Sequence, residues 1–194
     1  MSGSERHLDA AELQAGLARI LDAPKDAGVL EMIVRRPRSD QREELAEGEL
    51  TPETGLVGDG WRARMGPAPA DDPLEPDTQL TVMNSRVVQL LAQDRTRWAL
   101  AGDQLFVDLD LSHANLPPGT RLAIGAAVLE VAAEPHNGCG KFVARFGVDA
   151  MKFVNSAEGR ALHLRGLYAK VVTAGTIRVQ DAVSVLRRPT VPAV

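Results

Sequence analysis

The sequence is short of several residue types, and each shortage excludes a class of protein. It contains one cysteine, so no disulfide forms within the chain and no zinc site is built from several cysteines. It has no apolar run long enough to span a bilayer. Basic residues do not outnumber acidic ones, since 22 Lys and Arg face 26 Asp and Glu. The net charge of −4 therefore does not favour generic binding to nucleic acid or to an anionic membrane.

Other signals are missing as well. The polar stretch Met1–Asp9 has no signal-peptide core, so we expect a cytoplasmic protein. The segment Gly55-Leu-Val-Gly-Asp-Gly-Trp61 is rich in glycine, but the Gly-Lys-Ser/Thr of a Walker loop does not follow it. No spacing of residues argues for a Ser-His-Asp triad. What remains is an ordinary globular composition, 44% hydrophobic and 25% charged, on a length that suits one domain.

Hydrophobic periodicity predicts many short strands and a few helices. Residues 8–21 have the spacing of an amphipathic helix, the acidic run Gln41–Glu49 favours a helix, and Thr51–Asp77 is typical of a loop. Further helices are expected at 85–92 and within 137–164. Alternating or continuous apolar runs predict strands at 29–34, 79–83, 105–111, 121–124, 127–132, 167–173, 176–179 and 182–186.

This order of elements predicts a mainly β (α+β) fold, a closed β-barrel with peripheral helices packed around it. The expected organisation is an N-terminal helical extension over residues 1–28, a barrel domain over 29–188 and a tail over 189–194.

The single thiol, Cys139, is the first candidate for chemistry. It lies in the run Glu134–Phe142, where Asn137 is the expected N-cap of a helix and Cys139 the second helical residue. A helix N-terminus favours thiolate over thiol and attracts anions, and Lys141 and Arg145 add positive charge nearby. The alternative is a buried cysteine that acts as a small hydrophobic residue.

Four segments resemble the MOSC domain, the module at the C-terminus of molybdenum-cofactor sulfurases. They are Gly55–Asp59, Gly102–Leu105, Leu116–Cys139 and Gly166–Asp181, in that order. The resemblance extends from about Val29 to Leu186. It implies a β-barrel that binds a molybdenum cofactor of the molybdopterin type and one cysteine that carries the chemistry.

The resemblance maps the family cysteine, a catalytic group and ligand of molybdenum, onto Cys139. It maps the family's Gly-Glu-Asn-Leu element onto cofactor-binding positions Gly102, Asp103 and Gln104, read here as Gly-Asp-Gln-Leu. The usual Arg-Pro-Cys context is replaced by His136-Asn137-Gly138-Cys139, which is typical of a divergent subgroup. The pyridoxal-phosphate desulfurase domain of the fused sulfurases has no counterpart, so we expect no pyridoxal phosphate site in this chain.

Other polar residues are candidates to hold the same cofactor. His136 precedes Cys139 by three positions and either assists the thiol or is a residue of a turn. Asn84 follows a strand and either binds a pterin edge or caps the next helix. Trp61 and Trp98 are candidates to line a planar cofactor, although Trp98 has the context of a core residue. The basic candidates, which otherwise solvate an acidic surface, are Lys141, Arg145, Arg165 and Lys170.

The resulting hypothesis is a protein that binds molybdopterin-type cofactor and acts through Cys139, in sulfur transfer or in cofactor-dependent reduction. It would be a sulfurtransferase or sulfur carrier, or a molybdenum-dependent oxidoreductase. The alternative is a non-catalytic module that binds an anionic pterin or a phosphate ligand, and a third reading is a degenerate member with a structural role. The expected partners are a small-molecule cofactor or substrate and a protein that donates sulfur or electrons, with no nucleic acid and no membrane.

Overall fold

A closed barrel is the centre of the computed structural model, which describes residues 6–65 and 76–189. Every neighbouring pair in the ring is antiparallel except β5 and β6, which run parallel. The ring closes because β1 pairs with both β6 and β11, which confirms the predicted closed barrel. In ring order its seven strands are β1 (Ala27–Arg35), β11 (Ala182–Arg187), β7 (Arg121–Ile124), β8 (Ala127–Val131), β9 (Leu167–Thr173), β5 (Leu80–Asn84) and β6 (Leu105–Asp108).

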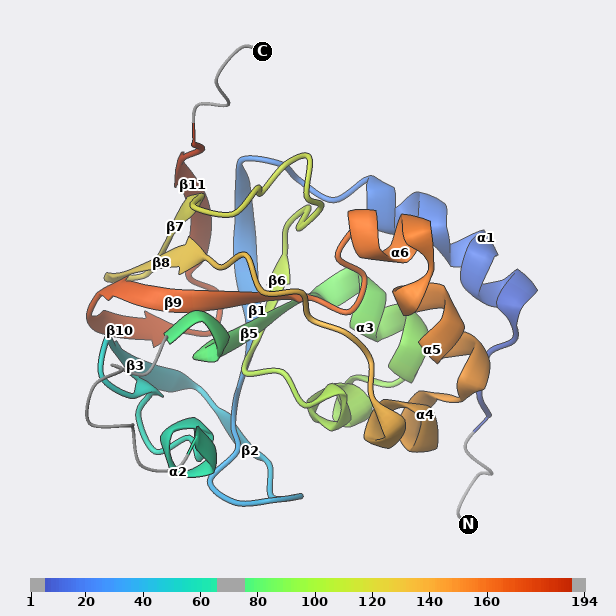
Figure 1. The fold of residues 1–194 in the computed structure, drawn as a ribbon, viewed down its shortest axis with the longest axis horizontal. Coiled ribbons are helices and arrows are strands. Elements are labelled where there is room, and N and C mark those ends of the chain that lie inside the picture. The colour runs from blue at the N-terminus through green and yellow to red at the C-terminus, as the bar shows by residue number, and fades with distance from the viewer. Residues whose placement is uncertain (1–5, 66–75, 190–194) are drawn as a thin grey trace.

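A second, smaller sheet lies beside the barrel (Figure 1). It consists of β10 (Gly175–Arg178), β3 (Glu47–Thr51) and β4 (Gly55–Leu56), while β2 (Glu43–Leu45) extends the barrel sheet from β1. The helix predicted over 41–49 is therefore wrong. Arg35 opposes Glu43 in the ladder and binds its carboxylate at 2.8 Å, so pairing between distant segments overrides local helix propensity.

The predicted loop over 51–77 contains more regular structure than expected. Besides β4 it includes the short helix α2 (Trp61–Met65) and the 3-10 turn η1 (Pro76–Thr78). Residues 66–75 of that prediction lie outside the described part of the chain.

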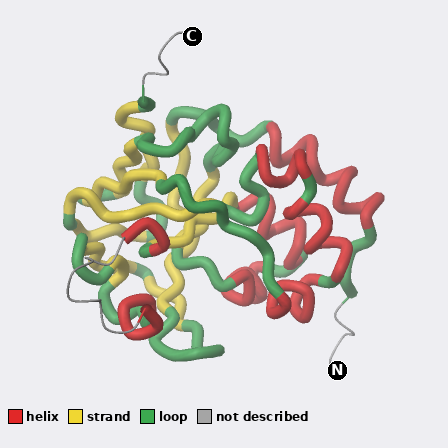
Figure 2. The backbone as a smooth tube through the Cα atoms, viewed as in Figure 1, coloured by secondary structure: helices red, strands yellow, loops and turns green. Residues whose placement is uncertain are grey.

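The other helices form a layer on one side of the barrel, as Figures 1 and 2 show. Helix α1 begins with a capping box at Asp9 and buries Leu13, Leu17 and Ile20, which confirms its predicted amphipathic packing. No helix within the described residues is long and apolar enough to cross a membrane. The layer comprises α1 (Ala10–Leu21), α3 (Ser85–Ala92), η2 (Arg95–Ala101), α4 (Gly140–Phe146), α5 (Val148–Asn155) and α6 (Ala157–Ala161).

Two apolar cores meet across the strands β5 and β6. Val82 and Leu105 belong to the core inside the barrel, whereas Met83 and Phe106, one position further along each strand, belong to the core under the helices. This alternation follows from the two-residue period of a strand. Both strands are thus buried on both faces, and the segments that leave them are fixed between the barrel and the helical layer.

Candidate functional site

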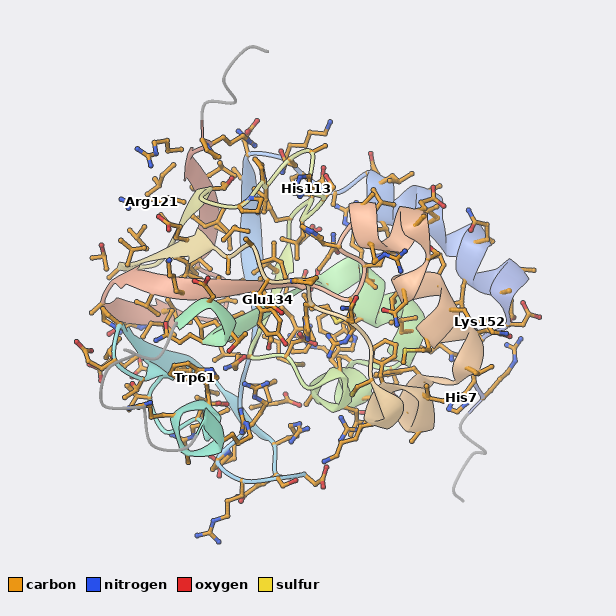
Figure 3. The ribbon with its side chains drawn as sticks, in the orientation of Figure 1. His7, Trp61, His113, Arg121, Glu134 and Lys152 are labelled. Carbon is orange, nitrogen blue, oxygen red and sulfur yellow. The ribbon has the colours of Figure 1, made fainter. Side chains whose placement is uncertain are left out.

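A cavity of about 300 Å³ lies where the barrel, α2 and the helical layer meet. Figure 3 labels two residues on segments that border it, Trp61 at the start of α2 and Glu134 on the connection from β8 to α4. The volume is at the lower end of the range of ordinary ligand pockets. Its lining residues are Arg36, Arg42, Trp61, Arg64, Thr78, Thr81, Ala101, Gly102, His136, Cys139, Lys141, Arg145, Arg165 and Tyr168.

The lining is strongly cationic although the whole chain is acidic. Among the described residues it contains five arginines and one lysine and no Asp or Glu side chain. Such a concentration of positive charge in a concave surface attracts anions and raises their local concentration. The charge of the lining therefore favours a negatively charged ligand.

Asp59 fixes two of these arginines from outside the cavity. Its carboxylate is fully buried and accepts from Arg36 Nε at 3.0 Å and from Arg64 Nη2 at 3.2 Å. The backbone amides of Arg36 and Trp61 also donate to it, each at 2.8 Å. Arg36 further donates to the carbonyl of Gly102 at 2.7 Å, which ties β1 to the segment between η2 and β6.

Arg42 has no carboxylate within salt-bridge distance in the described chain. One of its terminal nitrogens donates to the neighbouring Gln41 carbonyl at 2.8 Å, and its buried Nε has no hydrogen-bond partner. Burial lowers the pKa of Arg42, and repulsion from Arg145 and Arg36 lowers it further. The Asp40 carboxylate opposes this shift but forms no hydrogen bond with Arg42 in the described residues, so a further anion would stabilise the guanidinium.

Gly102 separates Arg42 from Arg145 at the cavity wall. Its φ of +90° is in the region that favours glycine, and a Cβ there would lie 3.7 Å from a nitrogen of each arginine. Arg145 donates to the carbonyl of Leu100 at 2.7 Å and pairs with Asp40 at 3.2 Å. The predicted role of Gly102 in binding is therefore compatible with its position between two cations.

The deepest part of the wall contains a buried ion pair. Arg165 donates to both carboxylate oxygens of Asp103, at 2.8 and 3.0 Å, and both side chains are buried. Burial raises the pKa of Asp103, and the Arg165 charge opposes that shift. Arg165 Nε lies inside without a hydrogen-bond partner, and the guanidinium carbon lies 5.1 Å from the centre of the Phe142 ring.

His136 stacks beside this pair against Tyr168, with ring centres 4.5 Å apart. Its Nδ1 is 3.7 Å from Asp103 Oδ1, beyond hydrogen-bond distance, and has no partner among the described residues. Burial lowers the pKa of His136 well below 6.5, and Arg165 and Arg36 lower it further. The imidazole is therefore neutral near pH 7.

Cys139 is exposed and lies at the mouth of the cavity. It is the N-cap of α4, in place of the predicted Asn137, because the amide of Gly138 donates to the Asn155 side chain at 3.0 Å and holds the preceding residues outside the helix. Burial raises the pKa of the thiol, but the backbone amides of Phe142 and Lys141 and the charges of Arg165 and Arg145 outweigh it. The net pKa lies below 9.0, in the direction of thiolate.

Seven of the residues singled out in the sequence come together in the lining: Trp61, Gly102, His136, Cys139, Lys141, Arg145 and Arg165. Asp103 and Gln104 lie directly behind it; Gln104 is buried and accepts from Thr81 at 2.6 Å. Asn84 is not in the lining, because its side chain caps α3 and donates to the Leu109 carbonyl at 2.8 Å. Lys170 also lies outside the lining and pairs with Asp77 and Glu130.

Sequence reasoning missed three arginines of the site, Arg36, Arg42 and Arg64. The arginines that follow the first predicted strand, Arg35, Arg36 and Arg38, have the sequence pattern of a solvated face or loop from which one side chain could reach an anion. Arg42 lay in a run interpreted as an acidic helix. Tyr168 was also missed, whereas Trp61 was considered and does line the cavity.

A larger cavity of about 570 Å³ lies between α1, α3 and the strands β1 and β6. Three arginines and three acidic residues line it, so its charges are balanced in number. Arg86 binds Asp108 at 2.6 and 3.2 Å, and the Arg95 guanidinium lies 4.6 Å from the centre of the Trp98 ring. The charged lining residues are Arg19, Asp22, Glu31, Arg86, Arg95 and Asp108.

No cluster of three or more His, Cys, Asp or Glu side chains suited to a metal occurs in the described residues. A metal in the smaller cavity would therefore come with an organic ligand and use the Cys139 thiolate as its protein donor. In the part of the chain that the structure describes, three lining residues each have a buried nitrogen without a hydrogen-bond partner: Arg42, His136 and Arg165. A thiol, unpaired donors and excess positive charge fit an anionic cofactor that contains a soft metal.

A family model described as the MOSC domain matches residues 71–184, more than half of the chain. Among solved structures, the YuaD protein from Bacillus subtilis is 15% identical, with a TM-score of 0.54, 81% of this chain covered and 94% of that chain. YiiM from Escherichia coli is 19% identical, with a TM-score of 0.54 and coverages of 84% and 71%. YiiM from Geobacillus stearothermophilus is 13% identical, with a TM-score of 0.51 and coverages of 83% and 74%.

At these identities the solved structures share the fold with this chain. No curated protein sequence matches it.

Proposed function

The chain belongs to the MOSC domain family, which is associated with the molybdenum cofactor, and from this premise we propose that it binds a molybdopterin-type cofactor in the cationic cavity. Cys139 would be the protein ligand of molybdenum or the residue that carries sulfur. The observation that supports this proposal is a lining of six cations without a carboxylate, with the chain's one thiol at its mouth.

The cations at one end of the cavity would hold the phosphate of the cofactor. Arg42 lines the cavity without a carboxylate at salt-bridge distance in the described residues, and Arg145 and Lys141 approach the same space from α4. Guanidinium groups bind phosphate through paired, charge-assisted hydrogen bonds, and lysine adds a point charge. The buried carboxylate of Asp59 keeps Arg36 and Arg64 directed toward the same cavity without entering the lining.

Beside these cations the lining offers a thiol and the rings of His136 and Tyr168. The lowered pKa of Cys139 increases the fraction of thiolate near neutral pH, and thiolates are suitable ligands for a soft metal. When bound, a molybdenum cofactor supplies a two-electron redox centre. Neutral His136 would offer its unpartnered Nδ1 to a polar edge of the ligand, and Tyr168 stacks behind it to fix the ring.

In the sulfur-transfer version the Cys139 thiolate attacks the terminal sulfur of a persulfide on a donor protein. A new S–S bond forms on Cys139, and the donor leaves as its thiol, so no external oxidant or reductant is needed. The positive charge of Arg145 and Arg165 near Cys139 would stabilise the anionic persulfide.

The decisive experiment is anaerobic purification of wild type and Cys139→Ser from a host that makes the cofactor, with assays for metal and for oxidised pterin fluorescence. We expect molybdenum and pterin in the wild type, and loss of molybdenum in the variant. The exposed position of Cys139 makes the serine variant compatible with folding, which circular dichroism checks. Wild type without either component, or equal molybdenum in both proteins, would contradict the proposal.

The alternative function is a non-catalytic module that binds an anionic pterin or a phosphate ligand. It is supported by the fact that the three unpartnered nitrogens belong to Arg42, His136 and Arg165 and do not involve the thiol. This version predicts that Cys139→Ser retains the ligand, whereas Lys141→Ala together with Arg145→Ala loses it. Arg121→Gln, on β7 outside the lining, is the control for removal of positive charge.

A further inference from the structure

The loop between β1 and β2, residues 36–42, places the carboxylate of Asp40 beside two cations of the cavity lining, Lys141 and Arg145. Asp40 accepts from Lys141 Nζ at 3.0 and 3.2 Å and from Arg145 Nη2 at 3.2 Å. Ser39 donates to the same carboxylate at 3.3 Å. Lys141 and Arg145 line the cavity, but Asp40 does not. Asp40, which follows the first strand of the barrel, thus pairs with two cations of α4.

Asp40 differs from the other two carboxylates that pair with cations of the lining. The side chains of Asp59 and Asp103 are fully buried and each receives several hydrogen bonds, so they are parts of the framework. The Asp40 side chain is 64% exposed, and its φ of +60° is a left-handed conformation at the tip of a loop. An exposed pair of this kind is weakly held and readily exchanged for another anion.

We propose that Asp40 is a tethered counter-ion of the cavity, which an incoming phosphate group displaces from Lys141 and Arg145. A phosphate would satisfy the same two cations and in addition lie beside the Arg42 guanidinium of the lining, with which Asp40 forms no hydrogen bond in the described residues. The exchange therefore favours a group with more oxygens and more charge than one carboxylate.

Tethering makes Asp40 a selectivity residue for the anion. A carboxylate ligand would offer Lys141 and Arg145 only what Asp40 already offers, and it would compete against a group held nearby at a high effective concentration. A phosphate dianion brings three acceptor oxygens and up to two charges, so it binds these cations more strongly than Asp40 does, whereas a carboxylate ligand would not. Asp40 thus excludes simple carboxylates and admits phosphate-bearing ligands. This inference depends on the proposed function only in taking the cavity as the anion site.

The test is calorimetric titration of full-length wild type and Asp40→Asn with inorganic phosphate and with acetate, at ionic strength matched with sodium chloride. Asparagine tolerates the left-handed conformation and removes only the charge. We expect Asp40→Asn to bind phosphate roughly three- to tenfold more tightly. We also expect it to bind acetate at concentrations where the wild type binds none.

Two further variants distinguish a carboxylate that competes with phosphate from a carboxylate that supports the cations. Asp40→Gly keeps the backbone conformation without a side chain and must reproduce the gain, whereas Asp59→Asn removes a framework carboxylate and must weaken phosphate binding. Unchanged or weaker phosphate binding in Asp40→Asn would overturn the inference, because Asp40 would then position the cations or play no part. Absence of phosphate binding in both proteins would overturn it as well.

The outcomes separate this inference from the proposed function. Tighter phosphate binding in Asp40→Asn, combined with a wild type that acquires no molybdenum or pterin, would support the counter-ion and contradict the cofactor. The reverse combination would support the cofactor and contradict the counter-ion.

Discussion

The two cavities described above contain similar side chains in opposite balance. The larger, between α1, α3 and the barrel, is lined by three arginines and three acidic residues. The smaller, beside Cys139, is lined by six cations and no acidic residue, with its carboxylates behind the wall or at the rim. The larger cavity thus has equal numbers of arginines and acidic residues in its lining, whereas the six cations of the smaller one share three carboxylates outside the lining and retain an excess of positive charge.

Electrostatic balance, and not volume, therefore distinguishes the candidate site from the larger cavity. An arginine paired with a carboxylate contributes to the fold, as Arg86 does with Asp108. An arginine held among other arginines weakens the fold unless an anion is bound, and Arg42 is such a residue. Substitutions at matched positions in the two cavities therefore separate residues kept for stability from residues kept for binding.

The largest expected effect is on stability, for Arg165→Gln compared with Arg86→Gln. Arg165→Gln leaves the buried Asp103 carboxylate without its partner, which costs about 3 kcal/mol of the free energy of unfolding. Arg86→Gln breaks a partly exposed pair and costs about 1 kcal/mol. Urea denaturation at pH 7 measures both values.

The loss in Arg165→Gln should also depend on pH in a defined direction. Without Arg165, burial raises the pKa of the Asp103 carboxyl in the folded state, and only the smaller effects of Arg36 and Thr81 oppose it. A carboxyl with a raised folded pKa takes up a proton on folding, so the variant regains stability as pH falls from 7 toward the unfolded value. Equal losses in the two variants, or a deficit in Arg165→Gln that does not change between pH 7 and pH 4, would mean that the two pairs are equivalent.

The next effect is on binding, for Arg42→Gln compared with Arg95→Gln. Loss of the Arg42 donors should weaken phosphate binding at least tenfold, because hydrogen bonds to charged groups contribute about 1.5–3 kcal/mol. Arg95→Gln, in the balanced cavity, should leave phosphate binding unchanged. Calorimetry with inorganic phosphate measures both.

Arg42→Gln should also retain or slightly raise the free energy of unfolding, by up to about 0.5 kcal/mol after solvent screening, because it removes repulsion from Arg145 and Arg36. Thermal unfolding without phosphate checks this. A large loss of stability would show that Arg42 belongs to the framework, and its role in binding would need another explanation.

The smallest expected effect is on the Cys139 thiol. Its pKa in the folded protein should lie below that of the same thiol after denaturation, since the α4 amides and two arginines favour the thiolate. Arg145→Gln should raise the pKa relative to wild type, and Arg86→Gln, in the other cavity, should not change it. The rate of alkylation as a function of pH gives each value, and the same pKa in folded and denatured protein would disprove the effect.

Much of the barrel could be predicted from the sequence. Strand 105–108 has the continuous apolar run of a strand buried on both faces, and strand 127–131 has the alternation of a strand buried on one face. The run Gln41–Glu49 could not be predicted in this way. Its strands depend on pairing with β1 and β10, residues far away in the sequence. The start of α4 could not be predicted for the same reason, since Asn155 from the end of α5 decides which residue is the cap.

The residues of the candidate site near Cys139 were predicted from the context of the thiol, and Gly102 was predicted from the family resemblance, but several distant arginines were missed. His136, Lys141 and Arg145 are local to the thiol, so its context identified them. Arg36, Arg42 and Arg64 lie 103, 97 and 75 residues before Cys139. Their local patterns predict a solvated loop or, for Arg42, an acidic helix. Only closure of the barrel brings their guanidinium groups to α4, through contacts that no local pattern encodes.

That closure has a kinetic consequence. The walls of the cavity come from residues 36–42 and 136–168, and they meet only when β1 pairs with β6 and β11. Such contacts between distant segments are slow to form and belong to the late stages of folding. A ligand that bridges them stabilises interactions made after the rate-limiting barrier, so bound anion should lengthen the lifetime of the native barrel and leave its rate of formation unchanged.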